Sequence, residues 1–169
     1  MVTIRRESPE DRAAVREVNE RAFGRSGEAS LVEELHARNK VLLSLVAIMD
    51  GRIIGHILFS PVTIEPGDDD FPAAGLAPMA VSPEFQKQGV GTLLIEAGLD
   101  ECRKAGIEGL IVLGHPNYYP RFGFVPASRY GIKCEFNVAD EVFMAMELRE
   151  GAFRNRQGTV KYQPEFDQF

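Results

Sequence analysis

Two closely spaced glycines form the part of the sequence whose chemistry is easiest to recognise. Gly89 and Gly91 lie in the segment 86–92, between an apolar run that ends at Val81 and a long helical pattern. Glycines let the backbone turn tightly and point successive N–H groups toward one position, and a helix start adds partial positive charge there. Such a turn can hold a pyrophosphate. Glycines that only join a strand to a helix are the alternative, and these two residues alone do not decide between them.

Two common phosphate-binding motifs do not fit this turn. A P-loop requires a Lys-Ser or Lys-Thr pair directly after its last glycine, and no such pair follows Gly91. A dinucleotide-binding fingerprint requires a third glycine three residues further on, where this chain has Leu94. A nucleotide-binding protein of either kind is therefore disfavoured, and the surrounding elements must show what the turn binds.

The segments around the turn predict an α/β (α+β) protein with a mixed sheet flanked by helices. Apolar runs and turn signals predict strands at 2–5, 41–49, 53–64, 76–81, 109–113, 123–126 and 143–148. Helical spacing predicts helices that begin after Ser8 and at 28–38 and 91–105, and Asp50-Gly51 predicts a hairpin. We expect an antiparallel first half, then a unit of strand, glycine turn, helix and strand. The last twenty residues predict no element.

Composition limits the class of protein. The 169 residues are 44% apolar and 26% charged, with a net charge of -6, which is typical of a single globular domain spanning 1–169. The acidic balance argues against a nucleic-acid partner. No apolar N-terminal core or membrane-length run is present, so we expect a cytoplasmic protein with no membrane partner. Two cysteines, Cys102 and Cys134, and an aspartate run at 68–70 without EF-hand spacing predict no metal site.

The glycine turn and its flanks resemble the signature of the GNAT superfamily of acetyl-coenzyme A dependent N-acetyltransferases. In the stretch MAVSPEFQKQGVG, Gln86, Gly89 and Gly91 meet the family pattern of Gln or Arg, two residues, Gly, one residue, and Gly or Ala. The stretch NYYPRFGF resembles the second block of the family, in which Tyr precedes a Gly-Phe pair by four residues. With the stretches GHILFSPV and VLGHP, these blocks are similar to the uncharacterised branch labelled YhbS-like. The resemblance spans nearly the whole chain.

The resemblance implies a GNAT-like fold, in which a central, mostly antiparallel sheet is splayed between its fourth and fifth strands. It also implies acetyl-coenzyme A as co-substrate, with the pantetheine arm bonded to the backbone of Met79, Ala80 and Val81, because an unpaired strand edge suits an extended amide-bearing chain. The pyrophosphate is expected on the glycine turn. The implied cofactor-binding residues there are Gln86, Lys87, Gln88, Gly89, Val90, Gly91 and Thr92.

Tyr119 holds the family position of the general acid, which protonates the departing thiolate while a neutral amine attacks the thioester. An N–H of Ala80 or Val81 is expected to hold the developing oxyanion. The alternative for Tyr119 is an ordinary aromatic that closes the core. Asn117 is expected to bond the cofactor, as the asparagine of the family does. That asparagine usually precedes the tyrosine by about two helical turns, whereas Asn117 is two residues away, so this helix is shortened.

The resemblance does not specify the base that removes the acceptor's ammonium proton. His115, at the end of the fifth strand, ranks first, and with Tyr119 it forms the expected catalytic pair. His56 lies inside a strand and more readily suits a buried structural histidine. The carboxylates are weaker candidates, because they more readily stabilise or solvate a helix. The candidates are therefore Glu28, Glu33, Glu34, His56 and His115.

Two functions remain open. The first hypothesis is an N-acetyltransferase that acts on a primary amine of a small molecule or a protein. The alternative is a non-catalytic module that binds an acyl-coenzyme A as a sensor or scaffold, and the presence of Tyr119 favours the enzyme. A homodimer is expected only because the superfamily often forms one. The acceptor, the use of acyl groups other than acetyl and the role of residues 151–169 are left unspecified.

Overall fold

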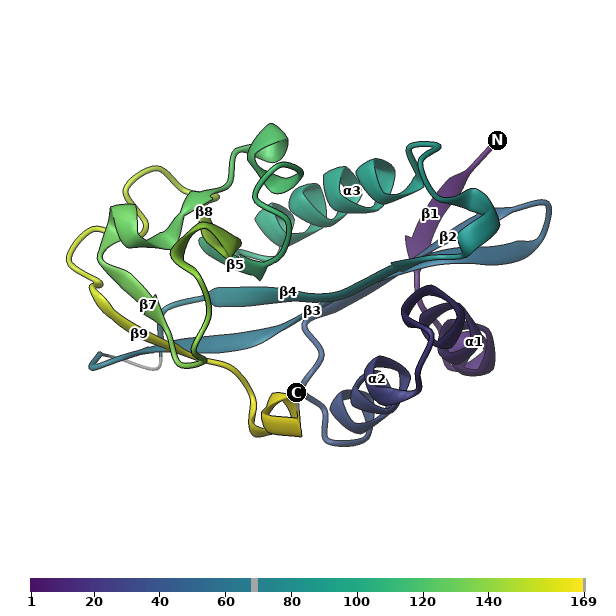
Figure 1. Ribbon diagram of the computed structural model, residues 1–169, viewed down its shortest axis with the longest axis horizontal. Coiled ribbons are helices and arrows are strands. Elements are labelled where there is room, and N and C mark those ends of the chain that lie inside the picture. The colour runs from purple at the N-terminus through teal and green to yellow at the C-terminus, as the bar shows by residue number, and fades with distance from the viewer. Residues whose placement is uncertain (68–69, 169) are drawn as a thin grey trace.

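The computed structural model describes residues 1–67 and 70–168, and Asp68 and Asp69 of the aspartate run lie outside the described residues. A twisted sheet crosses the molecule, with α3 on one face and α1 and α2 on the other (Figure 1). The helices are α1 (Arg12–Phe23), α2 (Gly27–Ala37) and α3 (Val90–Lys104). The strands are β1 (Thr3–Arg6), β2 (Leu43–Met49), β3 (Arg52–Glu65), β4 (Ala73–Val81), β5 (Gly109–Leu113), β6 (Val125–Pro126), β7 (Ile132–Cys134), β8 (Phe143–Glu147) and β9 (Gly158–Lys161).

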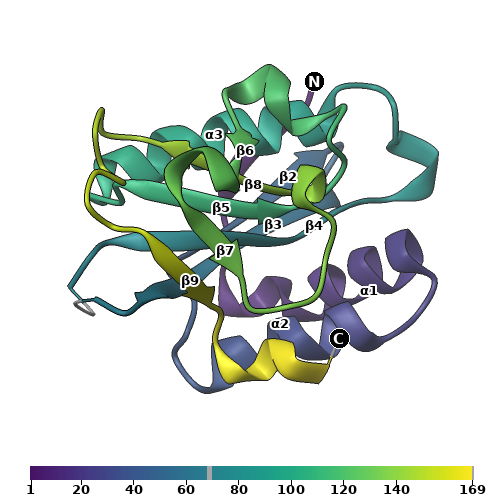
Figure 2. The ribbon, with the colours of Figure 1, turned by 60° about the vertical axis from the view of Figure 1, so that its left-hand side comes forward.

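The strands follow the order β1-β2-β3-β4-β5-β8-β6, and β4 and β5 are the parallel pair among antiparallel neighbours. This mixed sheet with helices on both faces confirms the predicted fold class. β7 and β9 pair with each other in parallel, and β9 also pairs with the C-terminal end of β3, so it extends the sheet there (Figure 2). The sequence predicts no strand at β7 or β9, and it leaves the last twenty residues without an assigned element; the structure places β9 and a 3₁₀ turn there.

A β-bulge in the β3–β4 ladder lies at the point where β4 and β5 stop pairing. The register along β3 shifts between Ile57 and Phe59, so that Ala77 and Pro78 of β4 lie opposite a single residue. A bulge bends its strand and increases the local twist. β4 pairs with β5 no further than Leu76. Beyond that residue the β5-facing edge of β4 is without its strand partner, and the expected splay between the fourth and fifth strands is present.

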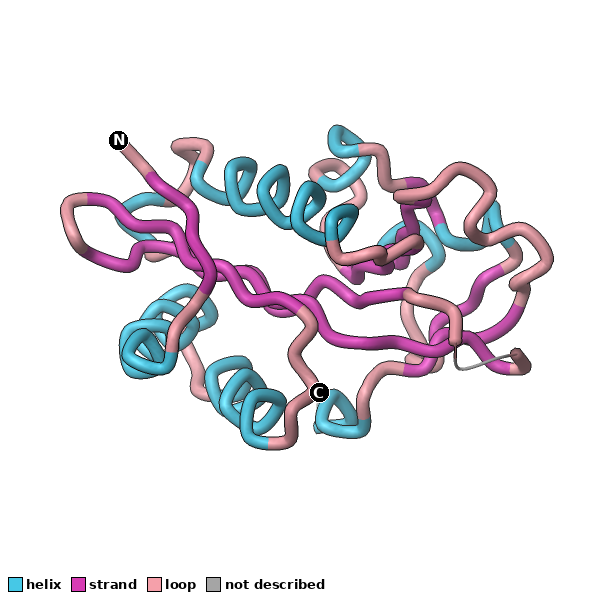
Figure 3. The backbone as a smooth tube through the Cα atoms, turned by 180° about the vertical axis from the view of Figure 1, so that it is seen from behind, coloured by secondary structure: helices cyan, strands magenta, loops and turns pink. Residues whose placement is uncertain are grey.

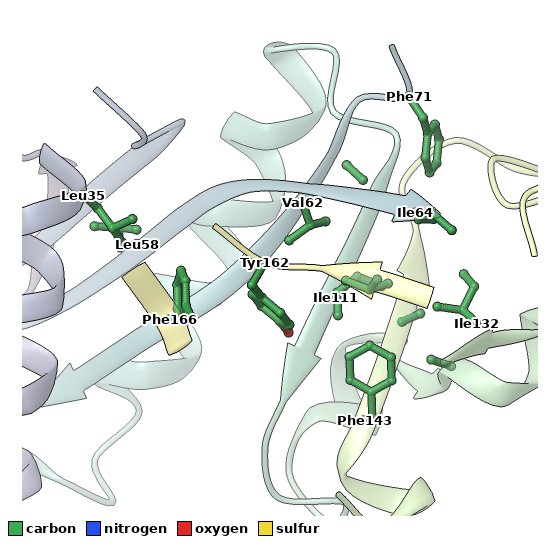
Figure 4. Close-up of a cluster of buried hydrophobic side chains, with 14 of the residues drawn as sticks. Leu35, Leu58, Val62, Ile64, Phe71, Ile111, Ile132, Phe143, Tyr162 and Phe166 are labelled. Carbon is green, nitrogen blue, oxygen red and sulfur yellow. The ribbon is translucent and has the colours of Figure 1, made fainter. Parts of the chain in front are cut away.

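Each face of the sheet carries its own apolar cluster. On the α1 and α2 face, Leu35 and Leu58 pack near Tyr162 and Phe166 of the C-terminal segment (Figure 4). On the α3 face, helix and strand approach closely, because a Cβ on Gly98 would lie 2.7 Å from the ring of Phe59. Each large apolar side chain buried in such a cluster stabilises the fold by roughly 1.5–3 kcal/mol.

The C-terminal segment folds back beneath the sheet. After β9 the chain forms a 3₁₀ turn, Pro164–Gln168, which lies beside α2 (Figure 3). The turn is held by the buried carboxylate of Glu165, which accepts hydrogen bonds from Lys40 at 3.0 and 3.1 Å and from Arg38 at 3.2 Å. These charged partners fix the position of the neighbouring Phe166. No helix in the described part of the chain has the length and apolar character that crossing a bilayer requires.

Candidate active site

The N-terminus of α3 opens into a groove. Gly89 precedes the helix with a φ of 89°, and Lys87 also has a left-handed φ, of 63°. Because the first N–H groups of a helix have no partner within it, and Gly89 has no side chain to cap them, the amides of residues 90–92 are available to a ligand. The groove has a volume of about 370 Å³ and is lined by Met79, Val81, Phe85, Gln86, Lys87, Gly89, Val90, Gly91, Thr92, Tyr118 and Arg121.

A larger hollow of about 750 Å³ lies where β4 and β5 diverge. Its walls come from α1, α2, β4, the end of β5 and the C-terminal turn, and they are formed by Phe23, Glu28, Leu31, Leu76, Ala77, Pro78, Met79, Gln86, Lys87, Leu113, Gly114, His115, Tyr118, Tyr119 and Phe166. Four residues line both spaces, so the groove and the hollow are continuous. Leu31 and Phe166 belong to the cluster on the α1 and α2 face, whereas Leu76 and Tyr119 belong to the cluster on the α3 face. The hollow therefore joins the two faces of the sheet.

Tyr119 lies at the wall of the hollow and is 7% exposed. Its ring meets Phe124 edge to face, with 5.7 Å between the centroids, and leaves no room for a Cβ on Gly114. Burial, with a smaller contribution from Tyr118, raises the pKa of Tyr119 to about 12. The phenol therefore keeps its proton at neutral pH and can donate a hydrogen bond into the hollow.

Tyr118 and Arg121 are site residues that sequence reasoning missed. A Cβ on Gly91 would lie 3.0 Å from the Tyr118 hydroxyl, so this oxygen reaches the first turn of α3. The guanidinium of Arg121 lies 4.6 Å from the Tyr118 ring centroid, and its Nε donates to the Tyr118 carbonyl at 3.1 Å. Arg121 thus adds a positive charge beside the groove. The sequence signal was weak, because an Arg two residues after the tyrosine pair looks like any exposed loop residue.

The expected cofactor-binding residues divide into two sets. Most of them line the groove: Met79, Val81, Gln86, Lys87, Gly89, Val90, Gly91 and Thr92. The Gln86 amide, however, donates to the Val81 carbonyl at 2.9 Å, so it also secures the loop to the end of β4.

Three expected cofactor-binding residues line neither space. The side chain of Gln88 donates to the Glu84 carbonyl at 3.0 Å. Ala80 is buried opposite His56 in the β3–β4 ladder. Asn117 is exposed on the loop that follows β5. The geometry gives no support to a cofactor contact from the side chains of Gln88 or Asn117, because neither residue lines the groove or the hollow.

Two of the five base candidates line the hollow, namely Glu28 and His115. Glu28 lies in the first turn of α2, and Arg25 donates to its carboxylate at 3.0 Å from Nε. Glu33 points away and pairs with Arg16 at 2.6 Å. Glu34 accepts a hydrogen bond from Gln168 at 2.7 Å. Neither Glu33 nor Glu34 is among the residues of the hollow.

His56 is a structural residue rather than part of the hollow. It is fully buried, and its Nδ1 lies 3.2 Å from the amide nitrogen of Asn19. The same amide nitrogen donates to the Val15 carbonyl, so it is the donor and His56 Nδ1 is the acceptor. The ring is therefore neutral with its proton on Nε2, which donates to the Ser44 hydroxyl at 2.9 Å.

The chain of hydrogen bonds from His56 ends at the buried carboxylate of Glu7. The Ser44 hydroxyl and His36 Nε2 both bond Glu7 Oε1, and an Arg12 nitrogen lies 2.7 Å from Oε2. Burial alone raises the pKa of Glu7, but the bonds from His36 and Ser44 and the nearby ring of His56, whose Nε2 lies 3.7 Å from Oε1, outweigh it and hold the carboxyl ionised, with its pKa well below the usual range. Burial lowers the pKa of His56, against a smaller raising effect of Glu7. This network holds β1, β2 and β3 together.

Comparison with known proteins identifies the family and the fold. Residues 12–124 match the family described as the acetyltransferase (GNAT) family. The chain belongs to the GNAT family. This GNAT protein is 33% identical over 167 residues to the uncharacterized N-acetyltransferase YhbS of Escherichia coli K12, covering 98% of this chain and 99% of YhbS. It is 46% identical over 135 residues to the uncharacterized N-acetyltransferase YjhQ of the same organism, covering 78% of this chain and 74% of YjhQ.

Two solved GNAT structures match nearly the whole chain. The crystal structure of E. coli YhbS in complex with CoA superposes with a TM-score of 0.95 at 32% identity, covering 99% of this chain and 93% of that one. The crystal structure of a GNAT family acetyltransferase from Brucella melitensis in complex with acetyl-CoA has a TM-score of 0.83 at 35% identity, covering 99% of both chains. The predicted superfamily, its fold and the acyltransferase class are thereby confirmed for this GNAT chain.

Proposed function

We propose that this protein transfers the acetyl group of acetyl-coenzyme A to a primary amine in the hollow beside Tyr119. The observation that carries the proposal is the continuity between the groove at the α3 N-terminus and the hollow at the β4–β5 splay. The groove fits the long, anionic part of the cofactor, and the hollow leaves space for an acceptor next to its end.

The residues of the groove suit a pyrophosphate. The free amides of residues 90–92 and the partial positive charge of the helix start favour an anion. Lys87 and Arg121 bring two cationic side chains to the same groove, and Thr92 adds a hydroxyl. The two solved structures described above contain CoA or acetyl-CoA, and the match of this chain to both supports the same ligand here.

The end of β4 suits the extended arm of the cofactor. Met79 and Val81 line the groove, and beyond Leu76 β5 no longer covers this edge of β4. An open strand edge offers N–H and C=O groups to an extended, amide-bearing chain. An arm bound along this edge leads from the α3 N-terminus to Tyr119.

The hollow supplies the groups that the transfer needs. Acetyl-coenzyme A brings the acetyl group as a thioester. Tyr119 donates a hydrogen bond to the departing sulfur, and because its pKa is about 12 it remains protonated throughout the neutral range. Glu28 and His115, which line the same hollow, are the two candidates to accept the proton of the attacking amine.

Direct attack by the amine is favoured over a route through an acyl-cysteine. Among the described residues that line the hollow and the groove there is no cysteine. Cys102 is buried in the cluster under α3, and burial raises its pKa to about 12, so it is not a reactive thiolate. Cys134 lies on β7, and burial raises its pKa as well.

Calorimetric titration with acetyl-coenzyme A, beside ATP and NAD as controls, tests the cofactor. Selective micromolar binding is expected, and its absence overturns the proposal. Release of free thiol on addition of amines then tests turnover. Binding without any acceptor-dependent thiol release would instead support the alternative function, a non-catalytic acyl-coenzyme A binding module.

A further inference from the structure

The wall of the hollow that lies away from the groove is mainly apolar. Phe23, Leu31 and Phe166 line it on the side of α1, α2 and the C-terminal turn. Phe23 is 39% exposed and Leu113 is 36% exposed, so both present apolar surface to the hollow. The surface that faces an acceptor is therefore suited to a hydrocarbon group.

One carboxylate interrupts this apolar wall. Among the described residues of the hollow, Glu28 is the only acid, and its side chain is 10% exposed. Arg25 makes three hydrogen bonds to its two oxygens, at 3.0 and 3.2 Å from Nε and at 2.5 Å from Nη2. A carboxylate accepts about four hydrogen bonds, so Glu28 retains capacity for one ammonium group.

The other polar residues of the hollow do not suit a second ammonium. Lys87 carries a positive charge at the boundary with the groove. His115 offers an imidazole, which carries no negative charge and cannot replace a carboxylate. The polar atoms of Gln86 and Tyr118 belong to the side shared with the groove, and Tyr119 is assigned to the departing sulfur. A second ammonium, or a sugar ring rich in hydroxyls, placed against Phe23, Leu31 or Phe166 therefore lacks a carboxylate partner, and such burial is unfavourable.

The size of the hollow is set by the C-terminal turn. Phe166 is held in place by its neighbour Glu165, which is fixed by Lys40 and Arg38 on the loop after α2. Phe166 also packs in the cluster with Leu35 and Leu58 (Figure 4). The wall is thus a fixed part of the fold, which favours an acceptor of limited size.

We propose that the acceptor is a primary monoamine carried on an apolar alkyl or aryl body, with its ammonium bound by Glu28 and its body against Phe23, Leu31 and Phe166. This inference rests on the proposed acetyl transfer. It excludes polyamines and aminoglycosides as preferred acceptors, and it assigns residues 164–168 a role in selecting the acceptor.

The first experiment compares four amines in the thiol-release assay: 2-phenylethylamine, hexylamine, spermidine and kanamycin. The two apolar monoamines are expected to have a kcat/KM at least about tenfold above the other two. A higher kcat/KM for spermidine or kanamycin overturns the inference. The inference is also overturned if octanoyl-coenzyme A prevents 2-phenylethylamine from binding, because the hollow would then hold the acyl chain instead of the amine.

The second experiment tests the two contacts with variants. Glu28→Gln is expected to raise the KM for 2-phenylethylamine about tenfold, with acetyl-coenzyme A affinity unchanged within about twofold. Glu33→Gln is the matched control on the same helix, because its carboxylate is 48% exposed and bonds Arg16 outside the hollow. Phe23→Asp adds an acid to the wall and is expected to shift the ratio of kcat/KM toward spermidine about tenfold.

Calorimetry on the same proteins separates the two ways to fail. If the unaltered protein does not bind acetyl-coenzyme A, the proposed function is wrong and this inference falls with it. If it binds and acetylates amines, but Glu28→Gln leaves the KM unchanged or Phe23→Asp leaves the amine preference unchanged, this inference alone is wrong. Thermal unfolding of each variant, compared with Glu33→Gln, shows that a change in KM does not come from loss of folded protein.

Discussion

The hydroxyl of Tyr118 lies over Gly91, so close that a Cβ on Gly91 would be 3.0 Å from its oxygen. This contact joins the loop after β5 to the first turn of α3, where the proposed pyrophosphate site lies. The backbone of Gly91 has no left-handed φ and suits any residue, so only the tight space beside this oxygen favours glycine at 91. Substitutions at Gly91 and at Gly89 should therefore differ, because the first crowds Tyr118 and the second strains the backbone.

Gly91→Ala is expected to lower the affinity for acetyl-coenzyme A about tenfold, because the new methyl group crowds Tyr118 and the groove. Folding stability should hold or rise by about 0.5–1 kcal/mol, since Ala is favoured within a helix. Calorimetry in the Tyr118→Phe background is the check. Without the hydroxyl, the loss caused by Gly91→Ala should shrink, and an equal loss in both backgrounds would contradict the contact.

Gly89→Ala should behave differently. A Cβ at this position meets no atom within 4 Å, but the φ of 89° is unfavourable for any residue with a side chain. We expect a loss of about 1–2 kcal/mol in the free energy of unfolding, measured by chemical denaturation. If Gly89→Ala were as stable as the unaltered protein, the left-handed turn before α3 would be incorrect.

Tyr119→Phe is expected to lower kcat about a hundredfold while leaving acetyl-coenzyme A affinity unchanged within about twofold, because only the proton donor is removed. Tyr118→Phe is the natural comparison. Since the pKa of Tyr119 is about 12, the rate should show no alkaline decline from this group up to about pH 10. An unchanged kcat on a good amine would mean that water or another group protonates the sulfur.

Arg121→Gln is expected to weaken acetyl-coenzyme A binding several-fold and to reduce its dependence on salt, because one of the cations beside the groove is lost. Arg129→Gln is the matched control, since Arg129 lies outside the groove, in the turn before β7. Titrations at two salt concentrations provide the measurement. Equal effects of the two substitutions would show that Arg121 acts only through the net charge.

Acid should destabilise the fold in a range set by His56. Because burial lowers the pKa of His56 in the folded state, the unfolded chain binds more protons below its usual pKa of about 6.5. The free energy of unfolding should therefore be constant near pH 7.5 and fall below pH 6.5, by up to about 1.4 kcal/mol per pH unit. The lowered pKa of Glu7 adds a further loss below its ordinary value of 4.5.

Denaturation curves at several pH values test this dependence. His115→Gln should keep the slope, because His115 is exposed at the hollow. His56→Gln should be less stable at pH 7.5 but lose less on acidification. A slope between pH 6.5 and 5.5 that disappears in His115→Gln and persists in His56→Gln would contradict the assignment.

The sequence predicts well those elements whose signals come from residues adjacent in the chain. Helix α3 begins and ends within one residue of its prediction, because its apolar stripe and flanking glycines lie within the segment itself. β5 has the predicted bounds. β4 begins three residues before its predicted start, since Ala73 to Gly75 lack bulky strand residues. Gly75 is small because a Cβ there would lie 2.8 Å from Tyr162, a contact that no local pattern contains.

The site is predictable where a motif or a strand end marks it. Short motifs predict the glycine turn and Tyr119, and the end of the fifth strand predicts His115, whereas Glu28 is one weak candidate among five. Arg121 and Phe166 were not considered, because they reach the groove and the hollow through tertiary packing. Glu165 shows the reason: its partners Lys40 and Arg38 lie more than a hundred residues away in the chain.

The hollow that joins the two faces of the sheet has a consequence for the order of reaction. With the cofactor in the groove and the amine in the hollow, as proposed, the two ligands occupy separate spaces, so neither has to leave before the other arrives. Initial rates measured against both substrates should give intersecting rather than parallel lines in a double-reciprocal plot. Free coenzyme A should then compete mainly with acetyl-coenzyme A for the groove, and the acetylated amine mainly with the amine for the hollow.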